Sequence, residues 1–278
     1  MEGKVALVTG GTSGIGRAIA AGLARSGVTV VLLARNASRA EGTMSEIRRG
    51  IPSAKLEWVE GDLESLKTVR AAASQVVTRH PKLEILVCSA GVFHKERGET
   101  VDGIERTLQV NYLSHFLLTN LLGEALKRGA PSRVVFVASP YGNTRIDFDD
   151  LNLTRRKFTV LNSVPATKLA EILLAQELAE RWGPDRVSVN AIHPGLVAHT
   201  GLLTEVGGMW KFITNVFGGT PEKGADTAIW LATAPEAEGL TGKLWAKRKP
   251  RPTPGQGSDP AARKRLWAES VRLAGLAE

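Results

Sequence analysis

The sequence has one cysteine, two tyrosines and no long apolar run. A single cysteine excludes an internal disulfide and a zinc cluster built from cysteines, and it is typical of the reducing cytoplasm. The stretch Val28–Ala34 is interrupted by Thr29 and is much shorter than the roughly 18 apolar residues of a membrane-spanning helix. No signal-peptide pattern precedes the first strand pattern. We therefore expect a cytoplasmic protein with no membrane span and no metal site.

The chain does have enough apolar residues for a large core. It contains 278 residues, of which 43% are hydrophobic and 23% charged, which excludes disorder as its main state. Residues 243–278 hold nine Lys and Arg against three Asp and Glu, so they carry +6 of the net charge of +8. No pattern of stacking aromatic residues accompanies this charge, so we expect a solvated surface segment and not a nucleic-acid partner. An anion-binding lid formed by Lys247, Arg248, Lys249 and Arg251 is the alternative.

Short apolar runs alternate with longer amphipathic stretches along the whole chain. The runs predict strands at Val5–Val8, Val28–Leu33, Leu56–Val59, Ile85–Val87, Val134–Val137 and Val187–Ile192. The stretches predict helices at 14–26, 38–49, 64–79, 101–128, 165–182, 222–233 and 261–275. This alternation is typical of an α/β fold with a doubly wound parallel sheet of the Rossmann type. We expect a single domain over residues 1–249, followed by a Pro/Gly-rich linker and a C-terminal helical arm over 250–278.

A glycine-rich turn separates the first predicted strand from the first predicted helix. Glycines let the backbone approach a phosphate closely, and a helix N-terminus offers free N–H groups and a positive dipole end. The position between strand and helix is the context in which such a turn binds a dinucleotide. The predicted pyrophosphate contacts are Gly10, Thr12, Ser13, Gly14, Ile15 and Gly16.

The residue after the second predicted strand indicates which dinucleotide binds. An acidic residue at this distance from the glycines accepts the ribose hydroxyls of NAD, whereas a cation suits the 2′-phosphate of NADP. Arg35 stands here, and no Asp or Glu lies between Leu33 and Ala40. The sequence therefore favours NADP(H). Asp62, after the third predicted strand, is placed to accept from the adenine amino group.

Motifs over nearly the whole chain resemble the short-chain dehydrogenase/reductase family, in its retinol-dehydrogenase-like branch. Besides the glycine turn, they are Gly61-Asp62-Leu63, Ala90-Gly91-Val92, residues 110–116 (VNYLSHF), 133–139 (RVVFVAS) and 148–152 (FDDLN), and His193-Pro194-Gly195. The resemblance implies that Leu63, Ala90, Gly91, Pro194 and Gly195 line the cofactor. It also implies that Ser139 holds the substrate oxygen, that Asn111 anchors a water, and that Lys168 binds the nicotinamide ribose.

The same resemblance implies a tyrosine acid–base four residues before Lys168 and 25 residues after Ser139. Both spacings lead to Val164, whose side chain has no ionisable proton. A proton donor of this kind is worth about 10²–10⁴-fold in rate. Pro165 follows directly, and proline fits the first turn of a helix, so we expect this helix to begin near residue 165.

Other departures from the family pattern lie at the nicotinamide end. Cys88-Ser89 replaces the usual Asn-Asn before Ala90-Gly91, and His199 stands where a threonine is usual. Tyr141 and His199 are the candidate substitutes for the missing acid, since a histidine titrates near neutrality. Tyr112, His115 and His193 are expected to have packing or structural roles.

Residues 196–220 are rich in glycine and large apolar side chains and are expected to form a lid over a bulky apolar substrate. Three functions remain open. The sequence alone favours a non-redox enzyme, catalysing a cyclisation, isomerisation or elimination, that keeps NADP(H) without redox turnover. The alternatives are an NADPH-dependent carbonyl reductase or alcohol dehydrogenase with a substitute proton donor, and a catalytically silent dinucleotide- or partner-binding protein. A homo-oligomer is among the states that the sequence allows.

Overall fold

A computed structural model describes residues 1–278 apart from 140–143, 196, 198–218, 254 and 278. One mixed sheet has the strand order β3-β2-β1-β4-β5-β6-β7-β8, parallel except for the antiparallel pair β7–β8. Its strands are β1 Val5–Thr9, β2 Thr29–Ala34, β3 Leu56–Glu60, β4 Ile85–Cys88, β5 Ser132–Val137, β6 Val187–Ile192, β7 Leu244–Ala246 and β8 Lys249–Arg251. The doubly wound α/β prediction is confirmed, with two short strands at one edge that the sequence did not reveal.

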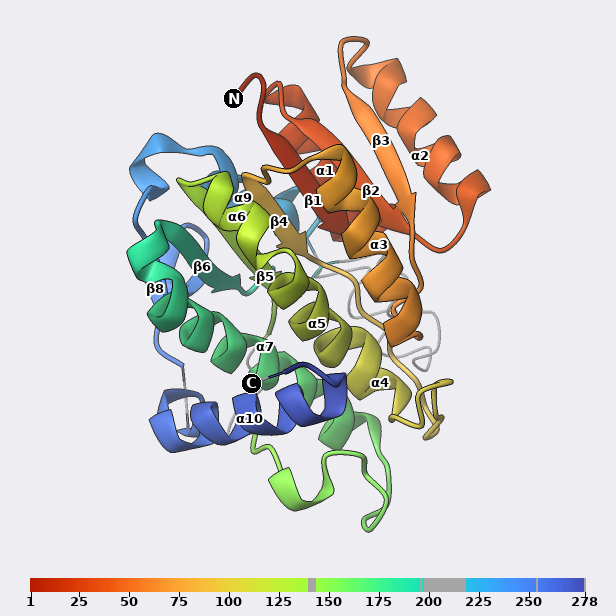
Figure 1. The fold of residues 1–278 in the computed structure, drawn as a ribbon, viewed down its shortest axis with the longest axis vertical. Coiled ribbons are helices and arrows are strands. Elements are labelled where there is room, and N and C mark those ends of the chain that lie inside the picture. The colour runs from red at the N-terminus through yellow and green to blue at the C-terminus, as the bar shows by residue number, and fades with distance from the viewer. Residues whose placement is uncertain (140–143, 196, 198–218, 254, 278) are drawn as a thin grey trace.

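Helices cover both faces of this sheet (Figure 1). Their bounds are α1 Gly14–Arg25, α2 Ala37–Gly50, α3 Leu66–Arg79, α4 Arg106–Leu108, α5 Ser114–Leu121, α6 Gly123–Arg128, α7 Val160–Trp182, α9 Pro221–Thr233 and α10 Pro260–Ala274. Two buried apolar clusters lie on opposite faces of the sheet, the larger under α3, α5 and α7 and the other under α1, α2 and α9. Strands buried on both faces explain the near-continuous apolar runs.

The prediction of one helix over 101–128 is wrong in two respects: the helical structure begins later, and it is divided into shorter segments. Residues 101–105 form turns and a bridge, and α4 begins at Arg106 with Glu105 as its cap. A π-helical turn, Gln109–Leu113, then separates α4 from α5. The apolar periodicity runs through all of these segments, so it does not show where the hydrogen-bond pattern changes.

The C-terminal helix α10 packs on α7 and α5 (Figure 1). The Trp267 ring lies edge-on to Phe116, with centroids 5.1 Å apart, and the Arg181 guanidinium lies 3.9 Å from the centre of the same tryptophan ring. Leu266 is buried in the larger apolar cluster. The predicted boundary between residues 249 and 250 falls inside β8.

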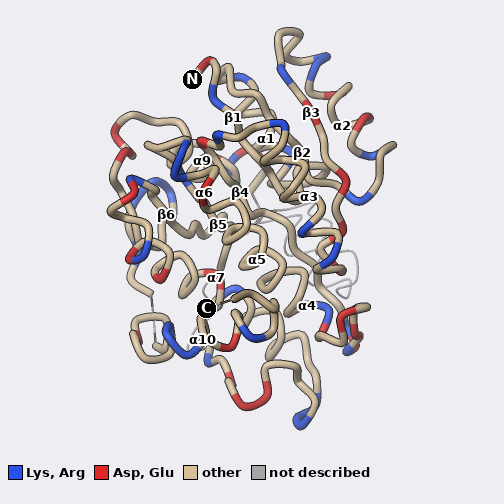
Figure 2. Tube along the Cα trace, in the orientation of Figure 1, with Lys and Arg blue, Asp and Glu red and all other residues tan. Residues whose placement is uncertain are grey.

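Lys, Arg, Asp and Glu are interspersed over the outer helices and loops (Figure 2). Four of the five arginines of the basic C-terminal segment have acidic partners, in the pairs Arg248–Asp226, Arg263–Glu177, Arg263–Glu180, Arg265–Asp149 and Arg272–Glu269. Its positive charge is therefore partly neutralised at the surface. Among the described residues, no helix combines the length and apolar character that crossing a bilayer requires.

Asp150 organises the loop that precedes α7. Burial pushes the pKa of this carboxyl upward, but hydrogen bonds from the backbone N–H groups of Thr154, Arg155 and Arg156 outweigh that effect and lower the pKa. Because the carboxyl pKa is lower in the folded protein than its unfolded value near 4, the ionised carboxylate stabilises the fold. This stabilisation is fully present above about pH 4 and is lost as the pH falls through the folded-state pKa. We expect Asp150→Asn to cost about 1–3 kcal/mol at pH 7 and much less in acid, as measured by urea unfolding. Equal stability of both proteins at pH 7 would contradict this role.

Candidate active site

The glycine turn lies between β1 and α1 and packs directly against the end of β4. A Cβ atom on Gly10, whose φ is +66°, would lie 2.7 Å from the Ala90 Cα, and one on Gly16 would lie 2.2 Å from the Gly10 carbonyl oxygen. Ser13 is the N-cap of α1, and its side chain makes no capping hydrogen bond. The turn therefore tolerates no side chain at these two glycines, and the positive end of α1 carries no side-chain cap. This cradle suits an anionic group such as a pyrophosphate.

Arg35 follows β2 at the same carboxyl edge of the sheet. Its guanidinium is 3.6 Å from a carboxylate oxygen of Glu64, and the Arg35 side chain is 60% exposed. Glu64 also lies 3.1 Å from the Arg106 Nε atom. Asp62 lies after β3, where its Oδ1 accepts from the Glu64 N–H at 3.0 Å. The exposed Arg35 can turn toward a phosphate, and Glu64 is a neighbour that the sequence did not single out.

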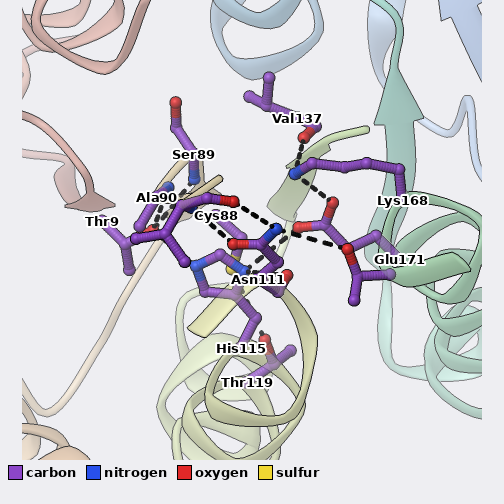
Figure 3. A network of polar contacts seen from close by, with 12 residues as sticks. Thr9, Cys88, Ser89, Ala90, Asn111, His115, Thr119, Val137, Lys168 and Glu171 are labelled. Carbon is purple, nitrogen blue, oxygen red and sulfur yellow. Dashed lines mark hydrogen bonds and ion pairs between the residues drawn. The ribbon is translucent and has the colours of Figure 1, made fainter. Parts of the chain in front are cut away.

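A buried polar network joins β1 to α5 and α7 (Figure 3). The Thr9 Oγ1 atom lies 2.9 Å from His115 Nε2, and His115 Nδ1 lies 3.2 Å from a Glu171 carboxylate oxygen. The other oxygen of Glu171 accepts from Lys168 Nζ at 2.7 Å, and Lys168 also donates to the Val137 carbonyl at 2.9 Å. His115 and Glu171 are fully buried, and Lys168 is 9% exposed. The lysine is thus fixed beside the end of β5 by a carboxylate one turn further along its own helix.

Asn111 and Gly91 lie close to this lysine. A Cβ atom on Gly91 would lie 3.5 Å from Asn111 Oδ1 and 3.8 Å from Lys168 Nζ. Asn111 is part of the π-helical turn, and its side chain accepts from the Val92 N–H at 2.7 Å and donates to the Val92 carbonyl at 3.1 Å. The turn after β4 is therefore clamped by the asparagine. The structure brings together Gly91, Asn111 and Lys168, three residues that the resemblance assigned to one site.

Ser139 and His193 meet where β5 and β6 end. The Ser139 Oγ atom lies 2.6 Å from His193 Nδ1, and the backbone N–H of His193 donates to the Trp245 carbonyl at 2.7 Å. Burial lowers the pKa of His193, and the positive charge of Arg251 lowers it further. At neutral pH the imidazole is therefore mainly uncharged. We did not predict this pairing from the sequence, from which we expected only a structural role for His193.

Val164 lies on α7, which begins at Val160 and not near residue 165 as predicted. The Thr159 hydroxyl accepts from the Asn162 N–H while the Asn162 side chain accepts from the Thr159 N–H, so a capping box starts the helix earlier. Pro165 is accommodated inside the helix. The Val164 side chain is 3% exposed, one turn before Lys168. Its methyl groups offer no proton donor at this place.

The remaining candidates are placed as follows. Tyr112 is buried and its hydroxyl is 2.7 Å from Ser270 Oγ, beneath α10, and burial raises the pKa of this phenol. Cys88 is fully buried at the end of β4, and burial raises the pKa of its thiol.

Tyr141, His199 and nearly all of the predicted lid over 196–220 lie outside the described residues. The remaining predicted cofactor contacts that are described lie in loops and helix starts after strands, at Thr12, Gly14, Ile15, Leu63, Pro194 and Gly195.

Comparison with known proteins gives consistent matches. A family model described as short chain dehydrogenase matches residues 4–209. Human retinol dehydrogenase 14 is 37% identical over 297 residues, covering 99% of this chain and 88% of the relative, and human retinol dehydrogenase 13 is 35% identical over 288 residues, covering 99% and 86%. A solved complex of RhlG with NADP from Pseudomonas aeruginosa superposes with a TM-score of 0.71 at 26% identity, covering 89% of this chain and 95% of RhlG.

Proposed function

Because the chain belongs to the short-chain dehydrogenase family, in its retinol-dehydrogenase-like branch, we propose that it is an NADP(H)-dependent carbonyl reductase or alcohol dehydrogenase. Its substrate would be a bulky apolar small molecule, as the name of the retinol dehydrogenase relatives suggests. One observation carries the proposal: the glycine cradle of α1 and the anchored Lys168 lie along the same carboxyl edge of the sheet. That edge, next to the β1–β4 switch point, is where doubly wound sheets bind ligands.

The described residues fit a dinucleotide. The start of α1 would hold the pyrophosphate, Arg35 would pair with the adenosine 2′-phosphate, and Lys168 would lie beside the nicotinamide ribose. A nicotinamide dinucleotide, when bound, supplies or accepts the hydride of the reaction. The ammonium group of Lys168 donates to the Val137 carbonyl, two residues before Ser139, so its positive charge lies near the end of β5. That charge would stabilise negative charge developing on a substrate oxygen held by Ser139.

The coenzyme preference provides a test at Arg35. Replacing Arg35 with aspartate removes the cation for the 2′-phosphate and supplies an acceptor for ribose hydroxyls. We expect the dissociation constant of NADPH to rise roughly 10–100-fold and that of NADH to fall, which corresponds to a charge-assisted hydrogen bond of about 1.5–3 kcal/mol. Fluorescence titration with both coenzymes measures the change.

The matched control is Arg49→Asp, which makes the same change of charge at the exposed end of α2. It should leave both dissociation constants within about twofold, as expected of a surface charge with no ligand contact. If Arg35→Asp and Arg49→Asp bind NADPH equally well, the assignment of Arg35 to the 2′-phosphate is wrong.

The second candidate is the non-redox enzyme favoured by the sequence, and the buried, aliphatic Val164 is the observation that favours it. Two features support the redox function over the non-redox candidate. The relatives over the full chain are named as dehydrogenases, and Ser139 has a titratable partner in His193. A protein that binds NADPH but oxidises it with no carbonyl compound would support the non-redox candidate.

The substrate-side organisation belongs to the same proposal. Residues 196–220 would cover the substrate, and 250–278 would act as a linker and arm of the single catalytic domain. Support for the arm comes from α10, whose Leu266 is buried in the core cluster under α7. A truncation after residue 249 should therefore expose apolar surface of α5 and α7 and destabilise the domain.

A further inference from the structure

We propose that His193 supplies the proton of the carbonyl reduction through the hydroxyl of Ser139, in place of a tyrosine. This inference rests on the proposed function, because it concerns the same reaction. From the sequence, we expected a structural role for His193, and the candidate substitutes for the missing acid were Tyr141 and His199. The geometry provides a donor that is hydrogen-bonded to Ser139, the residue proposed to hold the substrate oxygen.

The pairing of the two side chains is short and set by the sheet. Ser139 follows β5 and His193 follows β6, and these neighbouring parallel strands place the two residues side by side although 54 positions separate them. The Oγ–Nδ1 distance of 2.6 Å lies within the range for direct proton transfer. The backbone N–H of His193 is held by the Trp245 carbonyl on β7, which fixes the residue at the sheet edge.

The surroundings of the imidazole favour its neutral form. Burial lowers the pKa of His193, and the positive charge of Arg251 on β8 lowers it further. From the other side, Lys168 of α7 holds the Val137 carbonyl on β5, two residues before Ser139. Burial and the Arg251 cation make a protonated His193 a stronger acid here than in water. Loss of its proton to Ser139 is therefore favoured.

The proton and electron balance of the step is complete. The substrate carbonyl carbon gains a hydride, with its electron pair, from a reduced nicotinamide dinucleotide, which is thereby oxidised. The Ser139 O–H bond breaks and a new O–H bond forms on the substrate oxygen. The Nδ1–H bond of the imidazolium breaks and restores the Ser139 hydroxyl, which leaves His193 neutral with its proton on Nε2. Solvent protonates the imidazole again before the next turnover.

This arrangement predicts opposite pH profiles for the two directions. Reduction needs the protonated imidazole, so kcat/KM should rise as the pH falls through the lowered pKa of His193, below the ordinary value near 6.5. Oxidation of the alcohol needs the neutral imidazole and should remain fast up to neutral pH and above. We would measure both directions between about pH 5 and pH 8 with NADPH or NADP and the best substrate from a set of aldehydes, ketones and alcohols.

Three variants separate this role from a structural one. His193→Asn keeps a hydrogen-bonding group near the Nδ1 position but cannot titrate, and we expect it to lose about 10²-fold or more in kcat/KM for reduction near pH 5 and to have a flat profile. Ser139→Ala should lose the same pH dependence. Arg251→Gln removes the nearby cation and should move the acidic limb of the wild-type profile to higher pH.

A readout besides turnover is the ¹⁵N NMR titration of His193 in the full-length protein. We expect a pKa below 6.5 that changes in Ser139→Ala, because the hydroxyl bonds to Nδ1. A wild-type profile that His193→Asn leaves unchanged would overturn the inference. If the wild-type protein binds NADPH but turns over no carbonyl compound at any pH, the proposed function itself fails. A His193 titration indifferent to Ser139→Ala would then show that the pair is also not coupled.

Discussion

Replacing Glu171 with alanine is expected to lower the free energy of unfolding by about 3–5 kcal/mol, the cost of leaving buried charged groups without a partner. Glu171 is fully buried and bonds both Lys168 Nζ and His115 Nδ1 (Figure 3). The side chain of His115 is fully buried and that of Lys168 is only 11% exposed, so neither is well solvated when the carboxylate is removed. Urea unfolding monitored by circular dichroism measures the loss.

The matched control is Glu177→Ala, on the same helix and also buried. Its partner Arg181 is 45% exposed and can be solvated when the carboxylate is removed, and its other partner, Arg263, keeps a second carboxylate in Glu180. We therefore expect a loss of about 1 kcal/mol. A double variant, Lys168→Met with Glu171→Leu, should recover most of the stability because it removes both charges together. If Glu171→Ala costs no more than Glu177→Ala, the network does not hold Lys168 as described.

Replacing Val164 with tyrosine is expected to raise NADPH-dependent carbonyl reduction by about 10²–10⁴-fold over the Val164→Phe variant. Position 164 lies one turn before Lys168, so a phenol there would lie on the same side of α7 as the ammonium group. Both variants add a large ring at a site that is 3% exposed, and each should lose about 1–3 kcal/mol of stability. Only the tyrosine adds a hydroxyl, so the comparison isolates proton donation.

Combining this change with His193→Asn makes the test sharper. In the wild-type background the histidine substitution should abolish the acidic limb of the reduction profile, whereas in Val164→Tyr it should have little effect, since the phenol replaces the imidazole as donor. The measurement is kcat/KM against pH for the four proteins. Equal rates for Val164→Tyr and Val164→Phe above neutral pH, where His193 is uncharged, would contradict the idea that the lack of a protonated donor limits reduction there.

The strands and the glycine turn could be predicted because both depend on local sequence. Each central strand is buried on both faces and reads as an apolar run, and a strand–glycine–helix order has few other uses. The strands Leu244–Ala246 and Lys249–Arg251 were missed because each has three residues and the second is exposed and charged. The helix start at Val160 was missed because the capping box of Thr159 and Asn162 outweighs the signal from Pro165.

The site was only partly predictable for a different reason. The resemblance could indicate Ser139, Asn111 and Lys168 as site residues. That Gly91 lies close to Asn111 and Lys168 is seen only in the fold. The Ser139–His193 hydrogen bond joins residues 54 positions apart, and no pattern in the sequence links them. By contrast, Glu171 lies three residues after Lys168 on one helix, so the spacing could have indicated the ion pair.

The most direct measurement is the transfer of deuterium from NADPH labelled at C4 of the nicotinamide, with each face labelled in a separate reaction. The protein is incubated with a carbonyl compound, and the product alcohol is analysed by mass spectrometry. One of the two labelled forms should give an alcohol that carries a single deuterium at the former carbonyl carbon. NADPH that binds tightly while neither label ever reaches a product would contradict the assignment of this protein as an oxidoreductase.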